Sequence, residues 1–326
     1  MQAAFYTRNG PDADVFTVGD QPTPEPGPGE VRVRIRASGA NPSDWKTRKG
    51  GPGRKLIAPL IVPHSDGAGD IDAVGDGVPA SRIGERVWIW NGQWKRPFGT
   101  AAEFIALPSE QAVALPANVS YDEGACMGIP GLTALQAVRL ADPQPGMTVL
   151  VQAGAGSVGH YAVQMAKLRG ATVVATVSSE AKAAHARAAG ADHTIDYRRD
   201  DVAARVAEIT GGKGVDCIIE MDVAANAAKY PTMLRPHGTV VVYGMSALEA
   251  TLPTMWLMQN SITLKFFLVY ELSATDRAAC VQELGALLAA GKLQHTIALR
   301  LPLADVARAH DLIEGGTLTG NVVLQP

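Results

Sequence analysis

Between residues 148 and 244, short runs rich in β-branched residues alternate with runs that suit helices. The β-like runs read TVLVQA, TVVATV, HTIDY, VDCIIEM and TVVVYG. After the first of them, apolar residues recur at the spacing of one helix face, at Val158, Tyr161, Ala162, Met165 and Ala166. Alanine-rich stretches at 180–190 and 201–209 suit two further helices. Strands that alternate with helices predict βαβ units and a parallel sheet, so this part of the chain is predicted to be a doubly wound α/β domain.

The first part of the chain has the pattern of a compact β-rich domain. Val31, Val33 and Ile35 alternate with arginines, which is the period of a strand with one buried face. Proline and glycine keep the preceding QPTPEPGPGE out of regular structure, and RVWIW and AEFIAL are further short β-like runs. The chain closes with a helical stretch and two short β-like runs, whose domain the periodicity does not assign.

A glycine-rich turn joins the first β-like run of the α/β part to its helix. It reads Gly154-Ala155-Gly156-Ser157-Val158-Gly159, which is G-x-G-x-x-G between a strand and a helix. In such a turn Gly154 supplies the tight bend, Gly156 lets the backbone approach a pyrophosphate, and Gly159 lets helix and strand pack closely. The N–H groups of the first helical turn then face the phosphates. The turn therefore predicts a dinucleotide site.

Two other interpretations use the same residues. The turn could join a strand to a helix without binding any ligand. A hydrolase would need a nucleophile at the centre of G-x-S-x-G, but Ser157 lies off that centre and the pentad centred on Gly156 has no nucleophile. The position of the turn in a βαβ unit favours the dinucleotide over both.

The end of the second β-like run bears on which dinucleotide is bound. An NAD site usually has Asp or Glu there, about twenty residues beyond the motif, to bind the ribose 2′-hydroxyl. Here Ser178 and Ser179 follow the run and Lys182 comes soon after, so hydroxyls and a cation are offered to a 2′-phosphate. Tyr197, at the end of the next β-like run, could cover the same adenosine end. These residues favour NADPH, although Glu180 opposes a phosphate and Lys182 could be a solvated helix lysine.

Composition and charge limit which other classes of protein the chain can belong to. The chain has 326 residues, 47% of them hydrophobic and 19% charged, which suits a soluble protein of about two domains. A net charge of −3 gives no electrostatic reason to expect nucleic acid or an anionic membrane as partner. Three widely spaced cysteines suit reduced thiols, and neither a secretory signal nor an apolar run of about eighteen residues stands out. The expected location is cytoplasmic.

Motifs spread over the whole chain resemble the medium-chain dehydrogenase/reductases, and most closely their zinc-free, zeta-crystallin-like NADPH:quinone oxidoreductase branch. The motifs are ASGANPSDWKTRKG, PHSDGAGDIDAVGDGV, GERVW, GLTAL, QAGAGSVGHYAVQMAK, GADHTIDYR, GVDCIIEM, GTVVVYG and GNVVL. The resemblance implies a GroES-like β-rich catalytic domain, residues 1–123 with 262–326, and a Rossmann NADPH-binding domain, residues 124–261. It also implies a homodimer or homotetramer.

The resemblance predicts no metal. Zinc-dependent relatives have a cysteine where Asn41 stands and a histidine where Ser65 stands, and neither residue replaces those ligands well. His64 with Asp66 is the remaining pair, and two ligands make a weak site. Without a Lewis acid, alcohol oxidation is disfavoured, and hydride transfer to a quinone or an α,β-unsaturated carbonyl is expected.

The resemblance also assigns residues to the site. Asn41, Lys46 and Thr133 match positions beside the nicotinamide, although many relatives have an aromatic hydroxyl where Lys46 stands. The resemblance also assigns cofactor binding to residues outside the glycine turn and the adenosine end, which are Tyr243, Gly244, Met245, Phe266, Phe267, Leu268 and Asn321. A surface role for Lys46 and helix packing for Thr133 are the alternatives.

Two other activities remain open from the sequence. One is an enoyl-thioester reductase on the same scaffold, which would need a basic channel for a pantetheine phosphate. The other is a weakly catalytic, crystallin-like protein that binds NADPH or RNA, and the acidic charge balance speaks against RNA.

Overall fold

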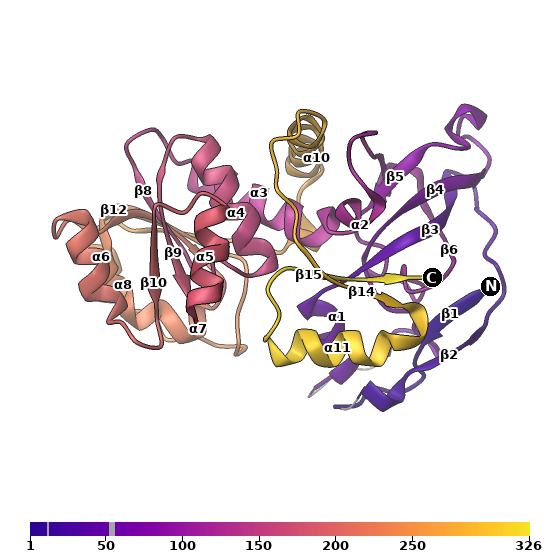
Figure 1. Ribbon diagram of the computed structural model, residues 1–326, viewed down its shortest axis with the longest axis horizontal. Helices are drawn as coiled ribbons and strands as arrows, with labels where there is room; N and C mark the ends of the chain where they lie inside the picture. The colour runs from indigo at the N-terminus through magenta and orange to yellow at the C-terminus, as the bar shows by residue number, and fades with distance from the viewer. Residues whose placement is uncertain (12, 52–55) are drawn as a thin grey trace. The chain divides into compact units, whose positions relative to one another are not determined.

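The computed structural model describes residues 1–11, 13–51 and 56–326 and divides the chain into two compact units (Figure 1). Unit 1 comprises Met1–Ile129 with Val281–Pro326, and unit 2 comprises Pro130–Cys280. These limits differ from the boundaries expected near residues 123 and 262. Unit 2 continues beyond residue 262 because β13 (Thr263–Phe266) pairs in parallel with β12 (Leu234–Val242) and so extends the sheet of unit 2. The functional division at 123 and 262 stays a prediction.

Unit 2 is built on a parallel sheet. Its described strands lie in the order β10-β9-β8-β11-β12-β13, with β8 (Thr148–Val151), β9 (Thr172–Val177), β10 (His193–Asp196) and β11 (Val215–Glu220). Every neighbouring pair is parallel. Counted from the first strand along the chain, the order is 3-2-1-4-5-6, which is that of a doubly wound dinucleotide-binding sheet. The predicted α/β class is confirmed, and each predicted β-like run between 148 and 244 contains a strand.

Helices cover both faces of this sheet, with α4 and α5 on one face and α6 and α8 on the other (Figure 1). The helical segments of unit 2 are α3 (Leu132–Ala141), α4 (Ser157–Leu168), α5 (Glu180–Ala188), α6 (Val202–Thr210), α7 (Val223–Asn226), η5 (Ala227–Lys229), α8 (Tyr230–Met233), α9 (Thr254–Gln259) and η6 (Val269–Glu271). Val206, Tyr230 and Met233 pack with sheet residues such as Ile218 in one core cluster. Helix α4 is buried on more than the single face predicted, because α3 packs against it as well as the sheet.

Unit 1 is built on a mostly antiparallel sheet. Its described strands lie in the order β14-β15-β3-β4-β5-β7, with β6 also paired to β3. These strands are β3 (Glu30–Ala40), β4 (Asp66–Val74), β5 (Arg86–Ile89), β6 (Phe104–Pro108), β7 (Ala112–Ala114), β14 (Ile297–Pro302) and β15 (Asn321–Gln325); β1 (Gln2–Phe5) and β2 (Thr17–Asp20) form a separate pair. The alternation predicted for β3 is confirmed, because Val31, Val33 and Ile35 are buried in one cluster with β5 and β6.

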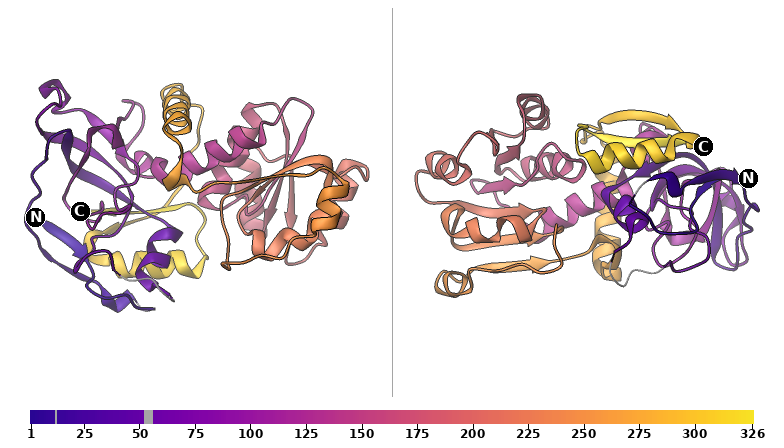
Figure 2. Two further views of the ribbon diagram at one scale, coloured as in Figure 1. Left: turned by 180° about the vertical axis from the view of Figure 1, so that it is seen from behind. Right: turned by 90° about the horizontal axis from the view of Figure 1, so that it is seen from below.

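Short helices connect the strands of unit 1, and two helices pack together beside them (Figure 2). The helical segments are η1 (Ala13–Val15), α1 (Pro42–Lys49), η2 (Ala80–Arg82), η3 (Ser109–Gln111), α2 (Tyr121–Gly124), η7 (Leu303–Asp305) and α11 (Val306–Gly315), and η4 (Met127–Gly131) and α10 (Ala274–Ala289) run across the unit boundaries. Helix α11 packs against α1 and η1.

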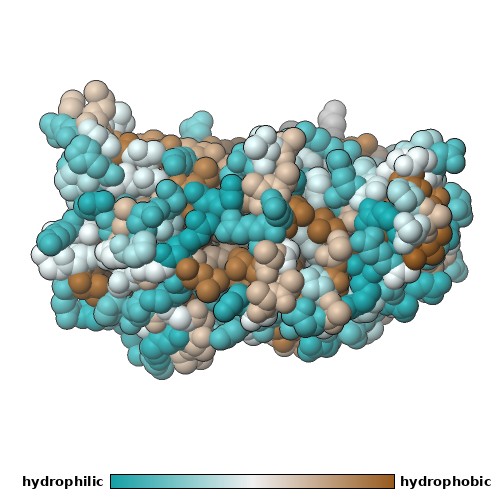
Figure 3. Space-filling model, turned by 90° about the horizontal axis from the view of Figure 1, so that it is seen from above, coloured by the Kyte–Doolittle hydropathy of each residue, from teal (hydrophilic) through white to brown (hydrophobic). Residues whose placement is uncertain are grey.

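The surface drawn in Figure 3 mixes polar and apolar side chains. Leu248, Met255, Met258 and Phe266 are among the large apolar side chains exposed in unit 2. Within the part of the chain that the structure describes, no helix is long and apolar enough to cross a membrane. The cysteines Cys126, Cys217 and Cys280 are buried and are not in disulfides.

Candidate active site

The carboxyl edge of the unit 2 sheet carries most of the predicted cofactor residues. Because the strands are parallel, the segments that follow β8, β9, β10, β12 and β13 all leave the sheet at this edge. They include the glycine turn, Ser178, Tyr197, the segment Tyr243–Met245 and the pair Phe267 and Leu268. In doubly wound sheets the ligand binds at this edge, where the strand order reverses, which here is between β8 and β11.

The glycine turn begins directly after β8 and is closed by backbone hydrogen bonds. Gly154 N donates to Thr176 O at 2.9 Å, and Gly156 N donates to Ala153 O at 2.9 Å. Gly156 is the N-cap of α4 in an extended conformation and makes no side-chain cap. The first N–H groups of a helix lack intrahelical partners and carry partial positive charge, so this end of α4 suits an anion.

The three glycines of the motif differ in how much space surrounds them. A Cβ added at Gly154 would lie 2.5 Å from Ala175 Cβ, and one at Gly159 would lie 2.2 Å from Ala153 O. Both positions therefore require glycine for the protein's own packing. A Cβ at Gly156 would meet only Ala153 O, at 3.2 Å. Packing within the protein therefore constrains Gly156 much less than Gly154 or Gly159, which is consistent with a ligand being what needs its bare backbone.

The segment after β9 presents hydroxyls and a cation. Ser179 is the N-cap of α5 and accepts a hydrogen bond from Lys182 N at 3.3 Å. Tyr197 N donates to Val177 O at 3.1 Å, which brings the half-exposed Tyr197 beside the start of this segment. Glu180, the residue expected to oppose a phosphate, forms an ion pair with Arg187. The backbone at Tyr197 is thus a neighbour of the start of the segment that holds Ser178 and Lys182, and the roles of these three residues in binding stay predictions.

The segments after β12 and β13 are neighbours as well. Phe267 N donates to Val242 O at 3.2 Å, and Tyr243 N donates to Glu220 O at 3.0 Å. A Cβ added at Gly244 would lie 2.2 Å from Met221 O, so the chain after β12 passes against the end of β11. The side chains of Phe266 and Leu268 are largely exposed.

Glu220, which sequence reasoning missed, ends β11 as a fully buried carboxylate. It accepts hydrogen bonds from Asp222 N at 2.7 Å, from Asn226 Nδ2 at 2.9 Å and from the Tyr230 hydroxyl at 3.3 Å. Burial raises the pKa of Glu220 in spite of these donors. The sequence did offer a signal, because Glu220 directly follows Ile218 and Ile219 in the β-like run VDCIIEM. A carboxylate is rarely buried in such a strand unless it has partners. Glu220 orders the segment between β11 and α7.

Thr133, near the start of α3, is 4% exposed, and its hydroxyl has no hydrogen-bond partner among the described residues. A buried hydroxyl without a partner costs free energy unless a ligand or water satisfies it. The open backbone at Gly156, the uncapped start of α4 and this hydroxyl all fit a dinucleotide in unit 2. The residues that would hold it are the turn, the segment after β9 and the segments after β12 and β13.

Asn41 and its neighbours form a buried polar cluster in unit 1. Asn41 Nδ2 donates to Asp66 Oδ2 at 2.9 Å, and Asp66 Oδ2 also accepts from Ile129 N at 3.0 Å. The backbone N–H of Asn41 donates to Asp44 Oδ2 at 2.7 Å, which caps α1. Desolvation raises the pKa of Asp66 well above its usual range and that of Asp44 to about 7. Asn41 is therefore fixed by two carboxyl groups, and its amide N–H is used within the protein.

Lys46 and Asn321 also belong to unit 1. The Lys46 ammonium lies 5.8 Å from the centre of the Trp45 ring, a cation–π distance, and its side chain is exposed on α1. Asn321 begins β15, where its Nδ2 donates to Thr296 O at 3.3 Å. The functional roles of both residues stay predictions.

Asn41, at one of the family's metal positions, and the candidate pair His64 and Asp66 are engaged in hydrogen bonds within the protein. The Asn41 amide is bonded to Asp66, and both ring nitrogens of His64 are engaged, Nδ1 at 2.9 Å from Ser38 Oγ and Nε2 at 3.0 Å from His310 Nε2. Over residues 1–11, 13–51 and 56–326 no three His, Cys, Asp or Glu side chains lie together as a metal site requires. The absence of a bound metal stays a prediction, and the metal content of the purified protein tests it.

The buried Asp44 predicts a pH dependence of stability. Because burial raises its folded-state pKa above the unfolded value, its contribution is full below the unfolded value of 3.8 and is lost as pH rises through about 7. Asp44→Asn keeps an oxygen for Asn41 N without a buried charge. We expect it to be more stable than the wild type at pH 8, by up to about 4 kcal/mol, by only about 1 kcal/mol at pH 4.5, and nearly equal to it at about pH 3. Thermal unfolding at several pH values, with the exposed Asp76→Asn as control, measures this; a gap between Asp44→Asn and wild type that stays constant with pH would contradict it.

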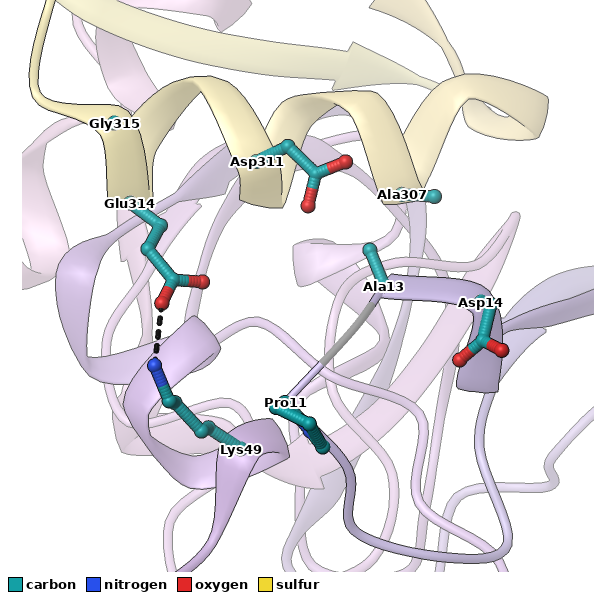
Figure 4. A pocket seen from close by; sticks show the side chains of 8 residues that line it. All are labelled: Pro11, Ala13, Asp14, Lys49, Ala307, Asp311, Glu314 and Gly315. Carbon is teal, nitrogen blue, oxygen red and sulfur yellow. Dashed lines mark hydrogen bonds and ion pairs between the residues drawn. The ribbon is translucent and has the colours of Figure 1, made fainter.

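A separate surface pocket of about 630 Å³ lies in unit 1 (Figure 4). Helix α11 lines one side with Asp311 and Glu314, and Glu314 forms an ion pair with Lys49 at 2.8 Å. None of the predicted site residues lines it. The pocket is therefore distinct from the predicted cofactor site of unit 2.

Comparison with known proteins agrees with this architecture. Residues 27–117 match the alcohol dehydrogenase GroES-like domain, and residues 157–288 match the zinc-binding dehydrogenase family. The chain is 34% identical to a quinone oxidoreductase of Pseudomonas aeruginosa over 269 residues, which is 80% of this chain and 81% of that protein. It is 31% identical to a 2-haloacrylate reductase of a Burkholderia species, in a match that covers 100% of this chain and 99% of that protein.

Solved structures give the same result. An NAD-dependent alcohol dehydrogenase superposes with a TM-score of 0.90 at 33% identity, and a mycobacterial protein complexed with NADPH superposes with 0.88 at 32% identity; both matches cover 100% of each chain. The chain belongs to the medium-chain dehydrogenase/reductase superfamily. It is an oxidoreductase of that superfamily with a nicotinamide dinucleotide as its cofactor, and its similarity to quinone oxidoreductases, inferred from its motifs, is confirmed.

Proposed function

We propose that this protein is an NADPH-dependent reductase that transfers a hydride to quinones or α,β-unsaturated carbonyl compounds without a metal ion. The observation that carries the proposal is the end of β9. There Ser178, Ser179 and Lys182 take the place of the carboxylate expected in an NAD site, and Glu180 is paired with Arg187. Hydroxyls and an ammonium suit a 2′-phosphate, whereas a carboxylate would repel it.

The nature of the acceptor is supported by the relatives and by the donor atoms of unit 1. One relative is named for quinones and another for a 2-haloacrylate, and both kinds of compound hold a C=C bond conjugated to a carbonyl or carboxyl group. In unit 1, Asn41 is hydrogen-bonded to the carboxyl groups of Asp44 and Asp66, which supports an acceptor that reacts without a Lewis-acidic metal. An acceptor that delocalises incoming charge onto its own oxygen needs no such ion.

The nicotinamide group supplies a hydride when the cofactor is bound. The chain would hold the dinucleotide through the turn Gly154–Gly159 and Lys182, with Thr133 as a hydroxyl able to bond its polar groups. With NADPH held there, an α,β-unsaturated carbonyl compound would gain a hydride at the carbon β to the carbonyl and a proton from water at the α carbon, and a quinone would become the hydroquinone, leaving NADP⁺ in either case. We propose Lys46 as the group of unit 1 that stabilises negative charge on the acceptor oxygen, and Asn41, whose amide nitrogen donates to Asp66, as a residue that helps to orient the acceptor.

A screen of NADPH oxidation tests the proposal. Purified protein is mixed with NADPH or NADH and with a small quinone, a cyclic enone, a 2-haloacrylate or an enoyl thioester of coenzyme A. We expect turnover with NADPH and at least one of the first three acceptors, at a kcat/KM at least tenfold above that with NADH. Turnover with the thioester alone would make the enzyme an enoyl-thioester reductase, and NADPH binding without any turnover would make it a binding protein.

Metal content is measured on the same preparation. We expect substoichiometric zinc and an unchanged kcat after treatment with a chelator, because the donor atoms of Asn41 and of the candidate ligand His64 are already hydrogen-bonded. Stoichiometric zinc whose removal abolishes turnover would contradict the metal-free mechanism. The cytoplasmic location and the homodimer or homotetramer are further predictions that the resemblance supplies.

A further inference from the structure

Ala153, between β8 and the glycine turn, has a left-handed backbone conformation. Its φ is 51°, in the region that side chains with a Cβ adopt only at a cost in free energy. The turn itself depends on this conformation, since Ala153 O accepts from Gly156 N at 2.9 Å and lies in contact with Gly159. The peptide of Ala153 therefore fixes where the first turn of α4 begins.

A buried threonine of the neighbouring strand contacts this residue. Ala153 N donates to Thr176 Oγ1 at 3.0 Å, and Thr176 Oγ1 donates to Gln152 Oε1 at 2.8 Å. Thr176 is 2% exposed and Gln152 is 7% exposed. A hydroxyl has one hydrogen to donate, and here the Gln152 carbonyl takes it, so a lone pair of Thr176 is directed to Ala153 N–H. In addition Thr176 O accepts from Gly154 N, so one residue holds two successive amides of the turn.

We propose that Thr176 is a positioning residue for the cofactor turn: its hydroxyl, oriented by Gln152, holds Ala153 in the left-handed conformation and so sets the turn before the dinucleotide arrives. The inference rests on the proposed function, because it takes the turn to be the phosphate-binding element. A turn that is already formed binds its ligand without the cost of ordering the backbone, so the hydroxyl acts on affinity through Ala153 rather than by touching the ligand.

The test uses the full-length protein and three variants. Thr176→Val keeps the shape of the side chain and removes the hydroxyl, Thr176→Ser keeps the hydroxyl, and Ala153→Gly removes the cost of the left-handed conformation. By titration of intrinsic fluorescence with NADPH, we expect Thr176→Val to raise the dissociation constant about tenfold and Thr176→Ser to stay within about twofold of the wild type. In the double variant Ala153→Gly with Thr176→Val, we expect affinity within about threefold of Ala153→Gly alone, because glycine does not need the hydroxyl.

A second readout needs no cofactor. In the free protein, hydrogen exchange at the amides of Ala153 and Gly156 should be at least about tenfold faster in Thr176→Val than in the wild type, and unchanged in Thr176→Ser. An unaltered exchange rate and an unaltered NADPH affinity in Thr176→Val would overturn the inference, and so would a loss of affinity that Ala153→Gly fails to rescue. A wild type that binds no NADPH, with the exchange pattern as expected, would instead reject the proposed function and leave the role of Thr176 in the turn intact.

Discussion

Gly159→Ala is expected to destabilise the protein by roughly 3 kcal/mol and to raise the dissociation constant for NADPH by about 100-fold or more. In a helix, alanine normally stabilises relative to glycine by about 1 kcal/mol. Here the added Cβ would lie 2.2 Å from Ala153 O, a backbone atom that is itself bonded to Gly156 N, so the turn has to move. The steric cost exceeds the helix propensity, and the displaced turn no longer directs its N–H groups at the phosphates.

Gly156→Ala is the matched control, because its backbone is compatible with alanine. Gly156 has φ −77° and ψ 168°, and a Cβ there would meet only Ala153 O at 3.2 Å. We expect a loss of thermal stability of no more than about 1 kcal/mol, for the small shift of Ala153 O, but an NADPH affinity about 10- to 100-fold lower, since the new methyl group occupies the place where the pyrophosphate approaches the backbone. Equal losses of stability in both variants, or full NADPH affinity in Gly156→Ala, would contradict the assignment of the turn.

Lys182→Glu is expected to reverse the preference between the two dinucleotides. A hydrogen bond to a charged group contributes about 1.5–3 kcal/mol, so its loss should raise the dissociation constant for NADPH about 10- to 100-fold, and the new carboxylate adds repulsion. NADH lacks the 2′-phosphate, and its affinity should change by no more than about threefold. The measurement is a pair of titrations, with NADPH and with NADH.

Lys213→Glu controls for the change in net charge, since Lys213 is exposed in the loop after α6 of the same unit. It should leave both affinities within about twofold of the wild type, because Lys213 precedes β11 and so lies at the amino edge of the parallel sheet, opposite the predicted site, and exposed charges at such a separation are screened. If Lys182→Glu weakened NADPH and NADH equally, Lys182 would be a residue of the general binding surface and the preference for NADPH would need another source.

Much of the unit 2 fold follows from local patterns. TVVATV is a run of β-branched residues and alanine without a charge, and the strand β9 spans all of it, Thr172–Val177, because both faces of a parallel sheet are covered. The strand β13 was harder to predict, since Thr263–Phe266 is short, carries Lys265 and is only partly buried. Its place is set by pairing with β12, which is a tertiary contact. For the same reason α4, predicted to bury one face, buries more when α3 packs on it.

In the candidate site too, some features follow from the local sequence and others depend on tertiary contacts. Glycine spacing predicted the turn, and the missing carboxylate at the end of the second strand followed from counting residues. The left-handed Ala153 and its contact with Thr176 did not follow, because alanine gives no signal of a positive φ and threonine is common in strands. Glu220 was likewise missed, although a charge within an apolar strand could have marked it.

The most direct test of the account is to follow the hydride. NADPH carrying deuterium at C4 of the nicotinamide, on one face or the other, is mixed with the protein and a cyclic enone, and the saturated product is analysed by mass spectrometry and NMR. The account predicts one deuterium at the carbon β to the carbonyl, from one of the two labelled cofactors only, in protein treated with a chelator as well as in untreated protein. A product without deuterium from either cofactor, or transfer that stops when metal is removed, would contradict it.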